Sequence, residues 1–117
     1  MKAKIKVLII DDEVEICYLL SNILQKKSID VEYACSLAGA RERLKFFIPT
    51  LIFLDNHLPD GLGVEFAGFL RNSLPDAKIV IITGQEIDNE GDSNDVPVVI
   101  LKPFTSEEIY SVIEQIA

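Results

Sequence analysis

Basic residues are scarce in this chain, and long apolar runs are absent from it. Asp and Glu outnumber Lys and Arg by 19 to 11, which gives a formal net charge of −8. Phosphate backbones and acidic membrane surfaces attract clustered Lys and Arg, so we expect neither nucleic-acid binding nor membrane association by this segment. No apolar stretch approaches the roughly 18 residues of a membrane span. The apolar run at 7–10 is too short for the core of a signal peptide.

Cysteine is also scarce, since Cys17 and Cys35 are the only two and stand in no metal-binding or redox spacing. Each lies in an apolar periodic segment, so we predict two reduced core residues and a cytoplasmic location. The 117 residues fit a single domain covering 1–117, with no room for a second folded module. The chain could be a complete small protein or one domain of a longer one.

Five short apolar runs alternate with helical patterns along the chain. The runs are rich in Val, Ile and Leu without polar alternation, as in strands buried on both faces of a parallel sheet. They lie at 5–10, 31–34, 51–54, 79–82 and 98–101. Apolar residues recur at helical spacing within 16–24, 37–47, 64–70 and 109–116. This alternation predicts an α/β fold with a doubly wound, five-stranded parallel sheet.

Residues 84–97 interrupt this rhythm. The segment contains one Ile, one Val and five acidic residues. That is too little apolar surface to hold a helix firmly against a core. We therefore expect the fourth helix of the fold to be short or disordered.

Polar side chains follow four of the five predicted strands. Asp11 and Asp12 follow the first strand, Asp55 the third, Thr83 the fourth and Lys102 the fifth. Ligands of open parallel sheets bind outside the carboxyl ends of the strands. These side chains are therefore expected to converge at one edge of the sheet.

Such a cluster has a specific chemistry. Three close carboxylates repel one another, so a proton or a cation must neutralise them. Mg²⁺ (or Mn²⁺) suits carboxylate oxygens, and a carboxylate beside it can attack a phosphoryl group. The ammonium of Lys102 and the hydroxyl of Thr83 would stabilise the charge of the transferred group.

Each element taken alone also has an ordinary structural interpretation. Asp12 could cap a helix, because the sequence from Asp12 to Glu15 resembles a capping box. Asp55 could belong to a turn that continues through 58–61. Thr83 and Lys102 are ordinary residues at strand ends. The joint arrangement, in this order at four strand ends, favours the functional interpretation.

The ordered set of residues resembles the receiver domains of two-component response regulators, the CheY-like family, over essentially the whole chain. Four motifs carry the resemblance, namely Ile-Ile-Asp11-Asp12-Glu13, Phe-Leu-Asp55-Asn-His-Leu-Pro59-Asp-Gly61, Ile-Ile-Thr83-Gly84 and Leu-Lys102-Pro103-Phe104. The resemblance implies the flavodoxin-like strand order 2-1-3-4-5. It also implies a cis Lys102–Pro103 bond.

The resemblance assigns a role to each residue at the predicted edge. Asp55 is the expected phosphoacceptor. Asp11, Asp12, Asp55 and the backbone carbonyl of His57 are the expected ligands of Mg²⁺ (or Mn²⁺). Thr83 is the expected switch hydroxyl and Lys102 the expected phosphoryl-binding lysine.

Further positions tune the reaction or depart from the pattern. The side chain of His57 and that of Gln85 correspond to positions that adjust the lifetime of the phosphoryl group. Val99 stands where the family often has a switching Tyr or Phe, and Gly84 where Ala is more common. Because valine is stiff at χ1, we hypothesise that ordering of 84–97 carries the signal instead.

The resemblance implies a phospho-accepting signalling switch rather than an enzyme in the usual sense. A sensor histidine kinase or a histidine phosphotransfer protein would donate the phosphoryl group, docking on the first helix and the loop after Lys102. Phosphorylation would change the face built from the fourth strand, fourth helix and fifth strand, with homodimer formation possible.

Three alternatives compete with this interpretation. The first is a degenerate receiver that acts as a phosphorylation-independent interaction module, favoured by Val99 and the unusual 84–97 segment. The second is a phosphohydrolase of the aspartyl-phosphate type, which usually has an Asp-x-Asp arrangement after the first strand. The third is a flavin-binding protein, but acidic Asp11 and Asp12 would repel its phosphate.

Overall fold

A five-stranded parallel sheet forms the centre of the molecule in the computed structural model, which describes residues 5–84 and 98–116. Its strands are β1 (Lys6–Ile10), β2 (Asp30–Ala34), β3 (Leu51–Asp55), β6 (Lys78–Thr83) and β7 (Val98–Leu101). All neighbouring strands are parallel and their order is β2-β1-β3-β6-β7. This is the predicted order 2-1-3-4-5, because β6 and β7 are the fourth and fifth strands of this sheet. The expected doubly wound fold is therefore confirmed.

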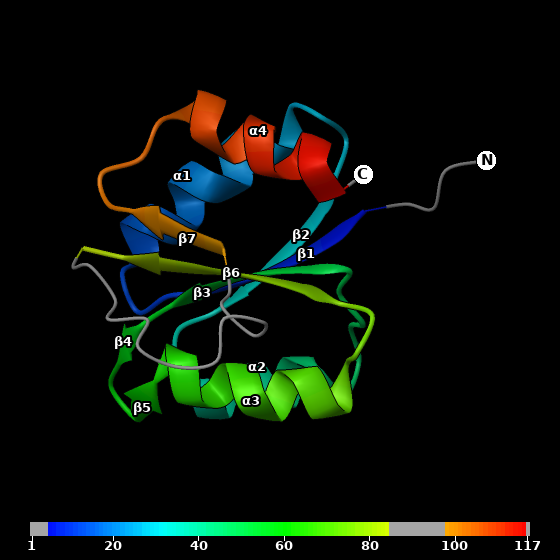
Figure 1. Ribbon diagram of the computed structural model, residues 1–117, viewed down its shortest axis with the longest axis vertical. Coiled ribbons are helices and arrows are strands. Elements are labelled where there is room, and N and C mark those ends of the chain that lie inside the picture. The colour runs from blue at the N-terminus through cyan, green and yellow to red at the C-terminus, as the bar shows by residue number, and fades with distance from the viewer. Residues whose placement is uncertain (1–4, 85–97, 117) are drawn as a thin grey trace.

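Helices cover both faces of the sheet (Figure 1). Helices α1 (Val14–Gln25) and α4 (Ser106–Ile116) lie on one face, and α2 (Leu37–Arg43) and α3 (Gly63–Ser73) lie on the other. Among the described residues, the connections from β1 to β2, from β2 to β3 and from β3 to β6 each contain a helix and join parallel strands. The arrangement leaves the carboxyl ends of all five strands at one end of the molecule.

Alternate residues of the strands enter two separate cores. Val7, Ile9 and Phe53 pack with α1 and α4, whereas Leu8 and Ile10 pack with α2 and α3. Every residue of β3 is buried. The strands at the edges, β2 and β7, are buried only in part. Continuous apolar runs thus predicted the central strands well, because those strands are covered on both faces.

Helix α2 is shorter than the apolar spacing within 37–47 predicted. It ends at Arg43, although Leu44 and Phe47 still pack into the core below the sheet. Proline lacks an N–H donor and disfavours helical geometry in the residue before it. Pro49 therefore disfavours a helix that continues through Ile48, and α2 already ends at Arg43, while Phe47 remains buried.

The prediction of two core cysteines is right for Cys17 and wrong for Cys35. Cys17 lies on the buried side of α1, whereas Cys35 is exposed. Cys35 directly follows β2, an edge strand, and precedes Ser36, the N-cap of α2. Both are free thiols.

A small antiparallel hairpin, formed by β4 (His57–Leu58) and β5 (Gly61–Leu62), leads from β3 into α3. The apolar pattern gave no sign of it, because each of its strands has only two residues. The expectation of a short or disordered fourth helix falls on residues 85–97, which lie outside the described residues. Among the residues described, no helix is long and apolar enough to cross a membrane.

Candidate functional site

The carboxyl ends of the central strands bring the predicted acidic residues together. Asp11 and Asp12 follow β1, and Asp55 is the last residue of β3. Carboxylate oxygens of the three residues lie within 4.8 Å of one another. Strand register explains this convergence, since Ile10 of β1 pairs with Leu54 of β3. The chain thus reaches Asp11 and Asp55 at the same level of the sheet.

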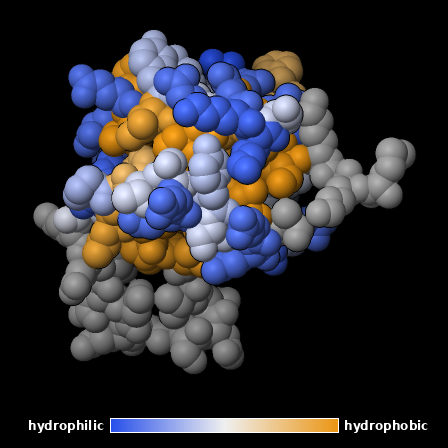
Figure 2. Space-filling model, turned by 90° about the horizontal axis from the view of Figure 1, so that it is seen from above, coloured by the Kyte–Doolittle hydropathy of each residue, from blue (hydrophilic) through white to orange (hydrophobic). Residues whose placement is uncertain are grey.

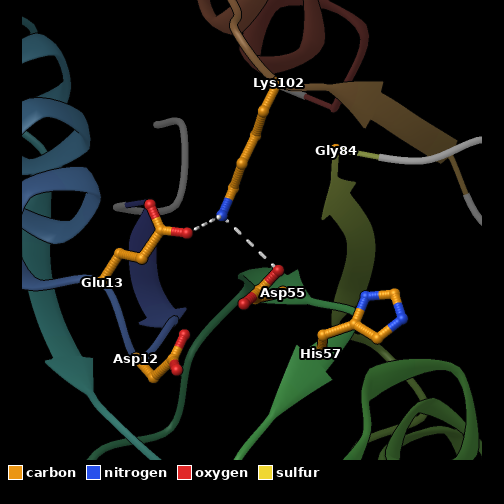
Figure 3. Close-up of a pocket in the computed structure, with 6 residues that line it drawn as sticks. All are labelled: Asp12, Glu13, Asp55, His57, Gly84 and Lys102. Carbon is orange, nitrogen blue, oxygen red and sulfur yellow. Dashed lines mark ion pairs between the residues drawn. The ribbon is translucent and has the colours of Figure 1, made fainter.

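An open hollow of about 420 Å³ lies above these strand ends (Figure 3). The carboxylates of Asp12, Glu13 and Asp55 and the ammonium of Lys102 line the hollow. His57 and Gly84 complete its lining. In Figure 3 the imidazole of His57 points away from the carboxylates. The hollow is therefore acidic, open to solvent and crossed by a single lysine side chain.

Lys102 reaches three carboxylates from the loop after β7. Its Nζ atom lies 3.0 Å from Asp11 Oδ2, 3.5 Å from Asp55 Oδ1 and 3.5 Å from Glu13 Oε1. The backbone of Lys102 is fixed as well, because its N–H donates to the carbonyl of Thr83 at 2.7 Å. The following Lys102–Pro103 bond is cis, as expected. One ammonium thus serves several negative charges.

Burial and mutual repulsion oppose the ionisation of the acidic residues. Desolvation, followed by the charge of Asp11, raises the pKa of Asp55 to about 6, although Lys102 acts in the opposite direction. Desolvation also raises the pKa of Asp11. At Lys102, burial works against the charge, but the contact with Asp11 and the nearby carboxylates outweigh it and raise its pKa. One ammonium alone does not neutralise this cluster.

The donor set suits a hard divalent cation. Asp11 is fully buried, and its Oδ2 atom has no well-directed hydrogen bond among the described residues, so its contact with Lys102 is an ion pair only. Its Oδ1 atom accepts from the Glu13 N–H at 2.9 Å, which aims the carboxylate. Carboxylate oxygens held in this way, with exposed Asp12 beside them, match the ligands that Mg²⁺ takes.

The loop after Asp55 is held by backbone contacts that the sequence did not reveal. Asn56 is buried, accepts the Gly63 N–H on its carbonyl at 2.8 Å, and accepts the Val64 N–H on its side-chain Oδ1 at 3.1 Å. Gly63 packs so closely that a Cβ there would stand 2.3 Å from the Asp55 carbonyl oxygen. These contacts fasten the start of α3 to the end of β3 and so fix the direction of Asp55.

The alternative role of Asp12 as a helix cap is wrong. The N-cap of α1 is Glu13, whose side chain makes no capping hydrogen bond. Asp12 is instead exposed and lines the hollow. Thr83 is completely buried at the end of β6, beside the strand that carries Asp55.

Two residues near the site escaped the sequence interpretation. Glu13 contacts Lys102, a role that its place after the acid pair could have suggested. Asp60 accepts the N–H groups of Leu37 and Ala38, both at 2.9 Å, and these bonds lower its pKa. Asp60 and the start of α2 are more than 20 residues apart in the sequence, so a local sequence pattern does not predict their contact.

Known proteins similar to this chain share both its sequence pattern and its fold. The family model of the response regulator receiver domain matches residues 7–114. The transcriptional regulatory protein CitB of Klebsiella pneumoniae is 37% identical over 81 residues, which cover 68% of this chain and 35% of CitB. The chain spans less than half the length of the curated relatives that it matches.

Solved structures align over nearly the full chain. The response regulator protein TrrA of Thermotoga maritima, in complex with Mg²⁺-BeF, is 25% identical with a TM-score of 0.85, covering 97% of this chain and 99% of TrrA. The beryllofluoride-activated NtrC4 receiver domain dimer is 29% identical with a TM-score of 0.79, covering 95% and 94%.

Proposed function

Because this chain belongs to the response regulator receiver domain family, whose members act as signalling switches and not as classical enzymes, we propose that Asp55 is its phosphoacceptor. The observation that carries the proposal is the placement of Asp55. Its carboxylate is nearly buried, faces an open hollow and lies 3.5 Å from the ammonium of Lys102. A nucleophile and a phosphoryl-binding cation therefore share one accessible cavity.

The reaction is a transfer from phosphohistidine to a carboxylate. An oxygen of Asp55 forms a bond to phosphorus while the N–P bond of the donor breaks, and the electron pair stays on the imidazole nitrogen. Lys102 pairs with the equatorial phosphoryl oxygens, and the Thr83 hydroxyl donates to one of them. In this proposal the raised pKa of Asp55 keeps its carboxylate basic and therefore nucleophilic near neutral pH.

Asp11, Asp12, Asp55 and the backbone carbonyl of His57 would hold Mg²⁺ (or Mn²⁺) for this reaction. The bound cation would supply positive charge to the phosphoryl oxygens and relieve the repulsion among the three carboxylates. Two observations support the assignment. The carboxylate oxygens are clustered, and the similar TrrA structure is a complex with Mg²⁺-BeF.

A sensor histidine kinase or a histidine phosphotransfer protein is the donor that we propose, acting in the cytoplasm. Its docking surface would be α1 with the loop after Lys102. Helix α1 exposes Val14, Tyr18 and Leu19, and Figure 2 shows apolar surface among hydrophilic side chains on the side of α1 and α4. Phosphorylation would change the face built from β6, β7 and residues 85–97, the last of which lie outside the described residues. We propose a homodimer as the product, because the activated NtrC4 receiver is a dimer.

Incubation with acetyl phosphate and MgCl₂ tests the proposal. We expect the intact mass to rise by one phosphoryl group, the gain to require Mg²⁺, and peptide mapping after borohydride reduction to place it on Asp55. Asp55→Asn should abolish the gain, while Asp76→Asn, a matched change at an exposed acid of the loop before β6, should leave it intact. A wild-type chain that takes no phosphoryl group would instead favour the interaction module.

A further inference from the structure

Glu13 occupies a distinct position among the groups that touch Lys102. Asp11 and Asp55 are buried beneath the ammonium, but the side chain of Glu13 is 60% exposed. It approaches Lys102 from the start of α1 and lines the same hollow as Asp55 (Figure 3). Glu13 is therefore an anionic group at the entrance, and it shares the ammonium that a phosphoryl group would need.

We propose that Glu13 is a specificity-determining residue that favours phosphoramidate-type (N–P) donors over acyl phosphates, an inference that rests on the proposed function. A phosphoryl oxygen arriving beside Asp55 competes with Glu13 Oε1 for the Nζ atom of Lys102, which lies 3.5 Å from each carboxylate. Glu13 also adds negative charge where the donor enters. This added charge acts more strongly against a donor of higher net negative charge.

The leaving groups of the two donor classes also differ in charge, and this difference again disfavours the acyl phosphate. In an acyl phosphate the O–P bond breaks and its electron pair departs on a carboxylate anion. In phosphoramidate the N–P bond breaks and its electron pair remains on a nitrogen that already carries its protons, which leaves as neutral ammonia. A carboxylate at the entrance repels the departing anion, whereas it accepts hydrogen bonds from the departing N–H groups.

The chain offers a matched control for this residue. Glu13 and Glu15 are both exposed acids at the start of α1, and substitution of either by Gln removes one negative charge there. Among the described residues, only Glu13 of these two forms an ion pair with Lys102. A comparison of the two variants therefore separates the specific position of Glu13 from a general change in surface charge.

The test measures phosphorylation rate constants with acetyl phosphate, a dianion, and phosphoramidate, a monoanion, by quenched intact-mass analysis at saturating Mg²⁺. We expect Glu13→Gln to raise the ratio of the acetyl phosphate rate to the phosphoramidate rate about two- to fivefold. Glu15→Gln should change this ratio by less than half as much. The effect of Glu13→Gln should shrink at high ionic strength, because salt screens exposed charges.

An unchanged ratio in Glu13→Gln, or an equal change in both variants, would overturn the inference. Thermal melts verify that both variants fold, as expected for exposed positions. Failure of the proposed function has another signature, because the wild-type chain would then gain no phosphoryl group from either donor, or the gain would persist in Asp55→Asn.

Discussion

Asp55 is a carboxylate whose charge is opposed by its own surroundings. It stands at the end of a strand buried on both faces, with a second buried acid at Asp11 and one ammonium as counter-charge. The cost of this placement is visible in its raised pKa. This buried carboxylate thus destabilises the fold, a cost that proteins commonly accept at functional sites.

The pH dependence of stability gives a direct measure of that cost. The pKa of Asp55 is about 6 in the folded chain, against roughly 3.9 when unfolded. Between these values the folded state binds more protons than the unfolded state, so the free energy of unfolding falls as pH rises. By linkage the loss reaches roughly 3 kcal/mol above pH 6. Urea unfolding from pH 4 to 7, with EDTA present to remove divalent cations, measures this loss of stability.

Two variants isolate the contribution of Asp55 to this pH dependence. Asp55→Asn cannot ionise, so its stability relative to wild type should rise across the same pH interval. Asp76→Asn is the control for the loss of one negative charge, because Asp76 is exposed and lies before β6, at the amino ends of the strands. A wild-type stability that rises between pH 4 and 6 in step with Asp55→Asn would contradict the prediction.

At the scale of elements, the connection between β3 and α3 holds Asp55 in place. Gly63 is the first residue of α3, and a Cβ there would collide with the Asp55 carbonyl, whereas a Cβ at Gly68 of the same helix would meet open space. We predict that Gly63→Ala destabilises the fold by about 1–3 kcal/mol through overpacking. Gly68→Ala should stabilise it by about 0.5–1 kcal/mol, because alanine is the better helix former.

Urea unfolding and phosphoryl uptake measured on both variants check this pair. Gly63→Ala should also slow phosphoryl uptake, since the methyl group must displace the backbone that carries Asp55. Equal stability and equal uptake in the two variants would show that the close packing at Gly63 does not govern the site.

The sequence predicted elements wherever burial alone determines them. Continuous apolar runs identified the five strands, and the parallel topology placed Asp11, Asp12, Asp55 and Lys102 at one edge. Apolar patterns along the sequence did not predict contacts between segments that are distant in the chain. The exposure of Cys35 and the Asp60 bonds to the start of α2 depend on which segments lie nearby in the fold, and a periodicity along the chain does not contain that information.

At the scale of the whole molecule, the acidic edge links segments that are far apart in the chain. Asp11 and Asp12 come from the end of β1, Asp55 from β3 and Lys102 from β7, so the cluster exists only in the folded sheet. A cation that requires all of these oxygens binds the folded chain and not the unfolded one. If this site binds a cation as proposed, metal affinity and folding stability would be linked quantities.

Magnesium should consequently raise the melting temperature. At a hundredfold excess over its Kd, the stabilisation is about 2.7 kcal/mol, which corresponds to an increase of several degrees for a domain of this size. The increase should be larger at pH 7.5 than at pH 5, because protons compete for carboxylates whose pKa values are raised. Differential scanning fluorimetry, with NaCl of equal ionic strength as the reference, measures this increase in melting temperature.

Two variants locate the cation. Asp12→Asn removes a proposed ligand and should reduce the increase in melting temperature, whereas Asp76→Asn should retain it. Equal increases in both variants would place the cation elsewhere.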